Sequence, residues 1–389
     1  MNYKSEYRAM DAGLLFSITI TVFVAAQFFL SFIALIVSEL IPSFYKSGYF
    51  GWMLQISLYV IFIVAIILYH VIARVNVVKA NGLNEKFSFV DFIMSAILGV
   101  GVLFTFMIFN YLYTLLLDAI GYKSSSGGVF MPINSIVTFL IATIAMCVFP
   151  AVTEEIVFRG AILKGYSKNF KFVPVMFISA VCFMLFHMNP PQFFNTLMLG
   201  IVYAIVIKKT KDGKITMVMH FANNFVVVFM TFIVSFIPED FLGAKTSLLV
   251  PSVPDIIQAI VPYVVLFVIG MIISALSLLY FFKRNSKKRY QQSRYRQGNY
   301  QQGNFQQGNF QQGNYQQGNY PQDEYQPQAK APVFDAQIDN NHNMELPFQD
   351  AMYYGEVKSP STQQKVVSLL LALPGVLIAI GYTIFVLLF

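Results

Sequence analysis

Charged residues are scarce in this sequence. Only 12% of the 389 residues are Asp, Glu, Lys or Arg, whereas 57% are hydrophobic. Soluble globular domains carry about 25% charged residues, so the composition excludes an ordinary soluble protein. It predicts an integral, multi-pass membrane protein with an all-α fold, because helices satisfy their backbone hydrogen bonds internally within lipid.

Cysteine and two protease signatures are also rare or missing. The two cysteines, Cys147 and Cys182, lie inside apolar runs and are interpreted as packing residues, not as a disulfide. The chain contains neither a G-x-S-x-G nor an H-E-x-x-H segment. These absences argue against a serine-nucleophile hydrolase of that type and against a zincin-type protease.

Long apolar runs, by contrast, are abundant. A membrane span needs about 20 apolar residues. Nine runs approach or exceed this length and are predicted to span the membrane; they are residues 13–37, 51–73, 89–117, 133–166, 172–188, 191–207, 214–237, 254–282 and 366–389.

Lysine and arginine mark every second connection between these runs. They precede the first run and follow the second, fourth, sixth and eighth, whereas the opposite connections hold few basic residues. Basic connections favour the cytoplasm, so the N-terminus is predicted to be cytoplasmic. This placement also explains the net charge of +7 without nucleic acid as a partner.

A polar segment separates the last two predicted spans. Residues 296–320 repeat a five-residue unit of the type Q-Q-G-N-F or Q-Q-G-N-Y. Such a composition cannot bury a core, so residues 283–365 are predicted to be a disordered cytoplasmic linker able to self-associate or bind cytoplasmic partners. The predicted division is a membrane core over 1–282, this linker, and a ninth span over 366–389, kinked near Pro374.

Residues 153–160 read T-E-E-I-V-F-R-G and place three charges in apolar surroundings. No Asp, Glu, Lys or Arg occurs between Lys123 and Glu154. Glu155 and Arg159 are four residues apart, so they share a helix face and are predicted to pair. Glu154 has no basic residue at that spacing. An unpaired carboxylate within a membrane span suits general acid–base chemistry.

Two histidines lie inside apolar runs, His187 in F-M-L-F-H-M-N and His220 in H-F-A-N-N. At about 1.5 Å per residue, counting from the basic turn after the fourth span places Glu154 and His187 at similar depth. His220 is predicted to lie shallower, with Asn224 one turn deeper. The four groups are predicted to line one cavity open to the cytoplasm, whereas His70 is interpreted as an interfacial residue.

These residues permit two routes to hydrolysis. In one, Glu154 and His187 activate a water molecule for attack on a carbonyl group. His220 and Asn224 then donate hydrogen bonds to the oxyanion. In the other, Glu154, His187 and His220 hold a zinc ion whose bound water is the nucleophile. Spacing does not separate the two routes.

Taken together, the three segments resemble the motif set of the CPBP family, which groups CAAX proteases with bacteriocin-processing enzymes and Abi immunity proteins. The family pattern is E-E-x-x-x-R, then F-x-x-x-H, then H-x-x-x-N. The resemblance covers roughly residues 130–235. The matching residues are, in order, Glu154, Glu155, Arg159, Phe183, His187, His220 and Asn224.

The resemblance implies an eight-helix intramembrane endopeptidase core, similar to the type II CAAX prenyl endopeptidases. It assigns water activation to Glu154 with His187 and a supporting or substrate-binding role to Glu155, Arg159 and Phe183. The family is classed as metalloproteases, so zinc or another divalent metal is implied, although a metal-free glutamate mechanism is compatible with the same residues.

The resemblance also implies a protein or peptide substrate in or at the membrane, including lipidated ones. It suggests peptide maturation or bacteriocin self-immunity in the plasma membrane of a bacterium.

Two other functions fit a buried Glu/His cluster. One is a proton- or ion-coupled transporter, although no repeat relates the spans. The other is a non-catalytic scaffold that acts through the polar linker.

Overall fold

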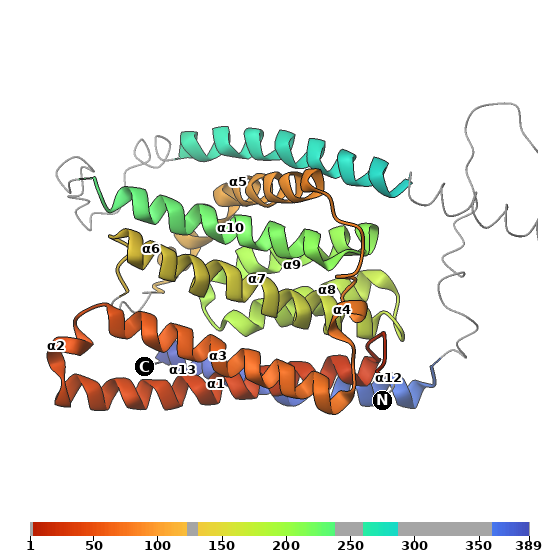
Figure 1. Ribbon diagram of the computed structural model, residues 1–389, viewed down its shortest axis with the longest axis horizontal. Helices are drawn as coiled ribbons and strands as arrows, with labels where there is room; N and C mark the ends of the chain where they lie inside the picture. Colours follow the sequence, from red (N-terminus) through yellow and green to blue (C-terminus); the bar gives the residue numbers. More distant parts are fainter. Residues whose placement is uncertain (1–2, 123–130, 238–259, 287–359, 389) are drawn as a thin grey trace, which may run out of the picture. The chain divides into compact units, whose positions relative to one another are not determined.

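The protein is built from helices that run side by side (Figure 1). The computed structural model describes residues 3–122, 131–237, 260–286 and 360–388, which form one compact unit. In these residues there is no β-strand, only an isolated bridge between Lys4 and Val75. The predicted linker lies outside the described residues over 287–359.

Each of the nine predicted spans corresponds to a helical segment. Within the described residues, eight helical segments are long and apolar enough to cross a membrane, and α8 is a shorter apolar helix. The chain is therefore an integral, multi-pass membrane protein. The segments are α1 (Ala9–Leu40), α3 (Tyr49–Ala73), α5 (Phe89–Ala119), Ile136–Lys164, α8 (Phe172–His187), α9 (Pro190–Thr210), α10 (Gly213–Val234), Ile260–Ser286 and Thr362–Phe385.

Short helices lie in two of the connections, α2 (Pro42–Tyr45) and α4 (Val77–Ala80). The eighth span extends to Ser286, four residues beyond its predicted end at 282. The last segment is split into α12 (Thr362–Leu370) and α13 (Leu373–Leu388). The interruption directly precedes Pro374, as expected for a residue that cannot continue an α-helical hydrogen-bond ladder.

The fourth span is one continuous helical run with alternating geometry. It consists of α6 (Ile136–Ala142), η1 (Thr143–Val148), α7 (Phe149–Glu154) and η2 (Glu155–Lys164), where η denotes π-helix. The sequence predicted one apolar span over residues 133–166, and in the structure this span has π-helix on both sides of α7. Such wider turns are rare and are found mostly at functional sites.

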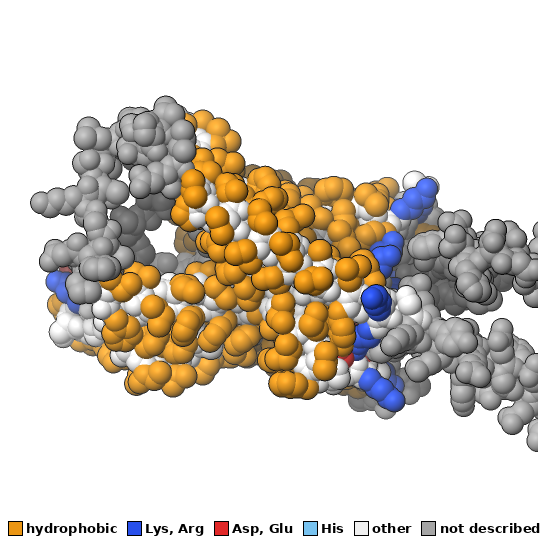
Figure 2. Space-filling model, turned by 90° about the horizontal axis from the view of Figure 1, so that it is seen from above, with side chains coloured by type: hydrophobic (Ala, Val, Ile, Leu, Met, Phe, Trp, Pro, Cys, Tyr) orange, Lys and Arg blue, Asp and Glu red, His pale blue; other side chains and the backbone are white. Residues whose placement is uncertain are grey.

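The basic connections meet at one end of the bundle. Figure 2 shows most of the visible lysine and arginine side chains gathered there, a smaller basic group at the opposite end, and mainly hydrophobic side chains between the two. Hydrogen bonds tie these connections together. The Lys164 amine donates to the Ala80 carbonyl oxygen at 2.9 Å, and the Lys214 amine donates to that of Leu83 at 2.8 Å. The basic connections that alternate along the sequence therefore lie together on one surface of the bundle.

The final span packs against α1. The Ser17 hydroxyl donates to the Leu371 carbonyl oxygen at 2.5 Å, where α12 has ended, and it accepts from the Gly375 N–H at 3.2 Å. A Cβ atom at Gly375 would lie 2.9 Å from the Ser17 Cα atom, so only glycine permits this approach. Small residues that allow backbones to come close are typical of helix pairs in membranes.

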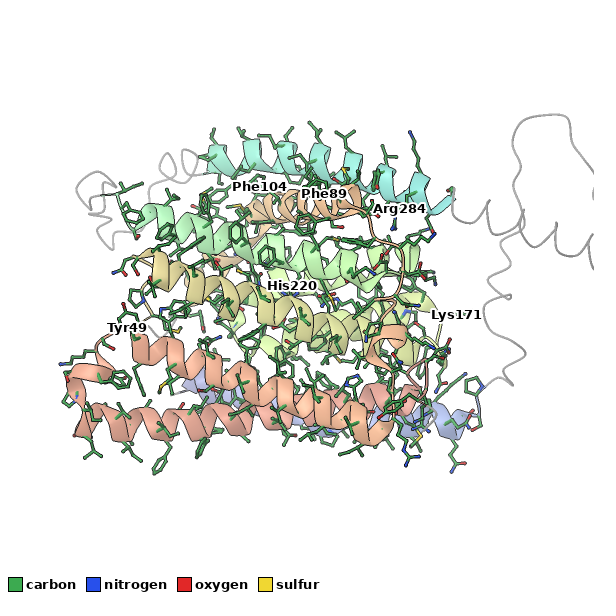
Figure 3. The ribbon with its side chains drawn as sticks, viewed as in Figure 1. Tyr49, Phe89, Phe104, Lys171, His220 and Arg284 are labelled. Atoms are coloured by element: carbon green, nitrogen blue, oxygen red, sulfur yellow. The ribbon has the colours of Figure 1, made fainter. Side chains whose placement is uncertain are left out.

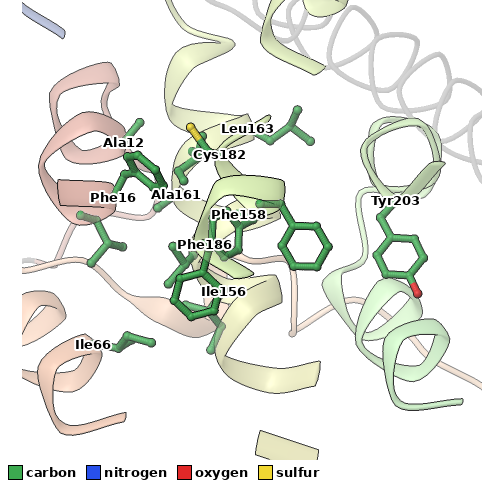
Figure 4. Packing of buried hydrophobic residues seen from close by; sticks show 14 of the residues in the cluster. Ala12, Phe16, Ile66, Ile156, Phe158, Ala161, Leu163, Cys182, Phe186 and Tyr203 are labelled. Atoms are coloured by element: carbon green, nitrogen blue, oxygen red, sulfur yellow. The ribbon is translucent and has the colours of Figure 1, made fainter. Parts of the chain in front are cut away.

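Aromatic side chains fill the core beside the charged segment. Phe158, Phe183 and Phe186 are each at most 2% exposed. The rings of Phe158 and Phe183 lie 5.1 Å apart in an edge-to-face arrangement, a favourable geometry for aromatic pairs. This cluster packs η2 against α8 (Figure 4). It therefore fixes the helix that carries Glu155 and Arg159.

Candidate active site

Glu155 and Arg159 form a buried ion pair. Arg159 Nη1 lies 2.9 Å from Glu155 Oε1, and both side chains are at most 2% exposed. The predicted pairing of these residues is confirmed. The Arg159 guanidinium also lies 4.1 Å from the centre of the Phe183 ring and 4.9 Å from that of Tyr203. The two rings hold the guanidinium through cation–π contacts.

Glu154 has one engaged and one unpartnered oxygen. The Tyr59 hydroxyl, on α3, donates to Glu154 Oε1 at 3.2 Å. No described residue hydrogen-bonds to Glu154 Oε2, although the side chain is only 2% exposed. A buried carboxylate oxygen normally has a hydrogen-bond partner. The second oxygen is therefore the atom of this residue that is free to bind water or substrate.

His220 lies next to both glutamates. Its Nδ1 atom is 3.1 Å from Glu155 Oε1, and its Nε2 atom is 3.8 Å from Glu154 Oε2. An ionised carboxylate only accepts hydrogen bonds, so His220 Nδ1 carries the hydrogen. In the neutral imidazole, Nε2 is then an acceptor facing Glu154. Depth counting placed His220 nearer the basic end, but the structure places it level with the glutamates.

His187 is the last residue of α8. Its Nδ1–H donates to the Phe183 carbonyl oxygen at 2.9 Å, which leaves Nε2 as the acceptor. The next residue, Met188, has a φ of 47° and turns the chain toward Pro190. His187 is half-buried and lies within electrostatic range of Glu154 and His220. The structure thus brings it to the same cluster.

Asn224 is anchored to the fourth span. Its side-chain amide donates to the Met146 carbonyl oxygen at 2.9 Å. In an α-helix that carbonyl would accept from the N–H of residue 150, but Pro150 has none. An amide group has two hydrogens, so Asn224 keeps one for another acceptor.

The cluster is largely buried. Glu154, Glu155 and His220 are each at most 3% exposed, whereas His187 and Asn224 are half-buried. Figure 3 places His220 inside the bundle, between the end marked by Tyr49 and the end marked by Lys171 and Arg284.

Sequence reasoning missed two tyrosines at this site. Tyr59 contacts Glu154, and Tyr203 contacts Arg159. Both stand singly in apolar runs, where nothing in the sequence distinguishes them from the other tyrosines of the predicted spans. His70, interpreted as interfacial, is instead 3% exposed, and its Nε2 accepts from the Tyr7 hydroxyl at 2.8 Å.

The metal hypothesis can be compared with this geometry. Glu154 Oε2, His187 Nε2 and His220 Nε2 are each left for a ligand, which suits zinc chemically. In the described ranges, however, no three His, Cys, Asp or Glu side chains are grouped so that they could hold a metal ion. The donor atoms therefore suit zinc chemically but are not grouped as a metal site in this part of the chain.

One stretch of the chain matches a known protein family. Residues 135–226 match the model of the Rce1-like type II CAAX prenyl endopeptidases. The match runs from the residue that caps α6 into α10 and contains all seven motif residues. Over these residues the chain is similar to the CAAX proteases. No curated protein and no solved structure matches the chain.

The match to the Rce1-like family includes the fourth span, α8, α9 and the first part of α10. These elements supply every contact of the cluster except that of Tyr59. The part of the chain that is similar to CAAX prenyl endopeptidases is therefore the part that holds the site.

Proposed function

We propose that the protein hydrolyses a peptide bond of a membrane-associated or lipidated protein or peptide, with Glu154 as the base that activates water. One observation carries this proposal. The Tyr59 hydroxyl fixes Glu154 Oε1, and Oε2 remains unpartnered 3.8 Å from His220 Nε2. Two hydrogen-bond acceptors at this separation suit one water molecule that donates a hydrogen to each.

The reaction begins when Glu154 Oε2 removes a proton from this water. The water oxygen bonds to the carbonyl carbon of the substrate, and the carbonyl oxygen becomes an oxyanion. The remaining N–H of Asn224 stabilises that charge. The C–N bond then breaks, and the proton held by Glu154 passes to the departing nitrogen. The products are a carboxylic acid, which then loses its proton to solvent, and an amine, and Glu154 is regenerated.

The other motif residues hold this arrangement in place. Glu155 accepts from His220 Nδ1 and so keeps His220 Nε2 directed at Glu154. Arg159 balances the charge of Glu155 within the apolar core. Phe183 stacks on Arg159, and its backbone carbonyl orients His187. His187 Nε2 supplies a further acceptor beside Glu154.

We place the basic end of the bundle in the cytoplasm, following the bias of lysine and arginine toward cytoplasmic connections. The lysines and arginines on this surface support that orientation (Figure 2). In a bacterial plasma membrane, the substrate would be a membrane peptide undergoing maturation or a bacteriocin against which the enzyme confers immunity. In a cell that prenylates proteins, it would be a prenylated C-terminus.

Comparison of protein termini in cells tests this proposal. Cells producing the wild type are compared with cells producing Glu154→Gln, which keeps the size of the side chain but removes the base. Glu39→Gln serves as the control, because Glu39 is exposed at the end of α1. A new terminus, present with the wild type and Glu39→Gln but absent with Glu154→Gln, identifies the substrate. Identical termini in all three would contradict the proposal.

A further inference from the structure

Tyr203 has a buried hydroxyl without a partner. The side chain lies on α9 and is 0% exposed. No described residue forms a hydrogen bond with its hydroxyl oxygen. Buried tyrosine hydroxyls usually find a partner, because losing the hydrogen bonds to water without replacement is unfavourable. Phenylalanine would supply the same ring without this cost, so the hydroxyl calls for a separate explanation.

The position of the Tyr203 ring is fixed by the site itself. The ring lies 4.9 Å from the Arg159 guanidinium and 5.9 Å from the His220 ring. Tyr203 also interacts electrostatically with Glu154 and Glu155. Figure 4 shows its hydroxyl turned away from the labelled phenylalanines. The unpartnered donor therefore belongs to the same cluster as the base.

The proposed reaction needs hydrogen-bond donors for its oxyanion. Asn224 uses one amide hydrogen on the Met146 carbonyl oxygen. His220 directs its Nδ1 hydrogen at Glu155, and its Nε2 faces Glu154. An oxyanion is generally stabilised by preorganised donors aimed at the developing charge. Among the motif residues, this leaves the second Asn224 hydrogen and the N–H groups of Arg159, whose guanidinium pairs with Glu155 and lies against two aromatic rings.

We propose that the Tyr203 hydroxyl supplies a further oxyanion donor and is thus a catalytic residue of this enzyme. This inference rests on the proposed function. The hydroxyl donates a hydrogen bond to the oxygen that gains negative charge as water adds to the carbonyl carbon. Its proton stays on the phenol throughout, and the bond is released when the carbonyl re-forms. A ring held by Arg159 and His220 provides the rigid placement that such a donor needs.

The test uses Tyr203→Phe in the full-length protein, reconstituted in liposomes with a farnesylated CAAX peptide as the substrate. We expect kcat to fall by about 100-fold, the usual loss for one oxyanion donor, with little change in KM. The melting temperature should be unchanged or higher, since only an unpartnered hydroxyl is removed. An unchanged kcat, or a loss of activity that follows a lower melting temperature, would overturn the inference.

Tyr166→Phe is the matched control. The Tyr166 hydroxyl donates to the Ser368 carbonyl oxygen at 3.0 Å, outside the site. Its removal should lower the melting temperature and leave kcat unchanged, the opposite of the pattern for Tyr203→Phe. This pair of variants separates a structural hydroxyl from a catalytic one.

If the wild type cleaves no peptide, the proposed function is contradicted. The role of Tyr203 can then still be tested by a binding measurement. The probe is a peptide phosphinate, whose charged oxygens resemble the oxyanion, compared with the amide peptide of the same sequence. The wild type should prefer the phosphinate, and Tyr203→Phe should lose most of that preference. Equal preference in the two proteins, or none in the wild type, would overturn the role of Tyr203.

Discussion

The side chain of Asn224 hydrogen-bonds to the Met146 carbonyl oxygen at 2.9 Å, and this carbonyl lies four residues before Pro150. Proline has no N–H and cannot make the α-helical bond to that oxygen. Pro150 thus leaves this oxygen without an α-helical donor, and the Asn224 amide bonds to it. We infer that Pro150, which has no catalytic chemistry of its own, helps to position Asn224 on another helix.

Pro150→Ala tests this relationship. The restored N–H should compete for the Met146 carbonyl oxygen and release Asn224 from its anchor. Because proline inside a helix costs about 3 kcal/mol, the variant should be more stable than the wild type. We nevertheless expect kcat to fall about tenfold through weaker oxyanion stabilisation. Pro42→Ala at the start of α2 is the control. A variant that is both more stable and fully active would contradict the positioning role.

Tyr59→Phe tests the contact that fixes Glu154. The Tyr59 ring packs against Phe62 and Phe149, so phenylalanine keeps this packing and removes only the hydroxyl. We expect kcat to fall about tenfold, because a base that loses its orientation transfers protons less efficiently. Single-turnover cleavage in liposomes measures the effect. Tyr382→Phe on α13 should cleave at the wild-type rate. Equal rates for all three proteins would show that Glu154 is oriented without Tyr59.

Arg159→Met should destabilise the fold. It leaves Glu155 buried without its cation, and breaking one side of a buried ion pair costs about 3–5 kcal/mol. Unfolding by a denaturing detergent in mixed micelles measures the change. Arg159→Lys keeps the charge and should recover part of the loss. Wild-type stability in the methionine variant would mean that Glu155 does not depend on this pair.

Chelation should not abolish cleavage. Glu154, His187 and His220 are not grouped as a metal site within the described ranges, and the proposed steps run through side chains alone. Purified enzyme is treated with a chelator, assayed for cleavage, and analysed for bound metal. Full activity in metal-depleted protein is expected. Loss of activity that zinc alone restores would show that these residues bind a metal.

The final span offers a pair of matched glycines. A Cβ atom at Gly375 would lie 2.9 Å from the Ser17 Cα atom, whereas in the described part of the chain no atom beyond the adjoining residues and turns of its own helix lies within 4 Å of one at Gly381. Gly375→Val should therefore push α13 away from α1 and lower the melting temperature, whereas Gly381→Val should not. Equal melting temperatures for the two variants would contradict the observed docking of the last span.

The features that could be predicted from the sequence are those that depend on a single helix. The spans follow from apolar length, and the pair formed by Glu155 and Arg159 follows from a spacing of four residues, which keeps both on one face even in the π-helix of η2. The gathering of basic residues at one end follows from their position between spans.

Contacts between helices could not be predicted in this way. The hydrogen bond from Tyr59 to Glu154 depends on how α3 is rotated about its axis, and spacing within α3 does not determine that rotation. The same holds for Tyr203 beside Arg159 and for His70 beside Tyr7. Depth counting also misplaced His220, because it assumes that neighbouring helices begin at the same level and run straight.

Cleavage of a defined peptide by purified protein tests the central claim most directly. Wild-type enzyme and Glu154→Gln are incubated in liposomes, in water enriched in oxygen-18, with farnesylated and unmodified CAAX peptides. Mass spectrometry then reads the new C-terminus. Wild-type enzyme should release a product carrying one heavy oxygen in its new carboxylate, and Glu154→Gln should release none. Cleavage by Glu154→Gln at the wild-type rate would contradict the assignment of Glu154 as the base.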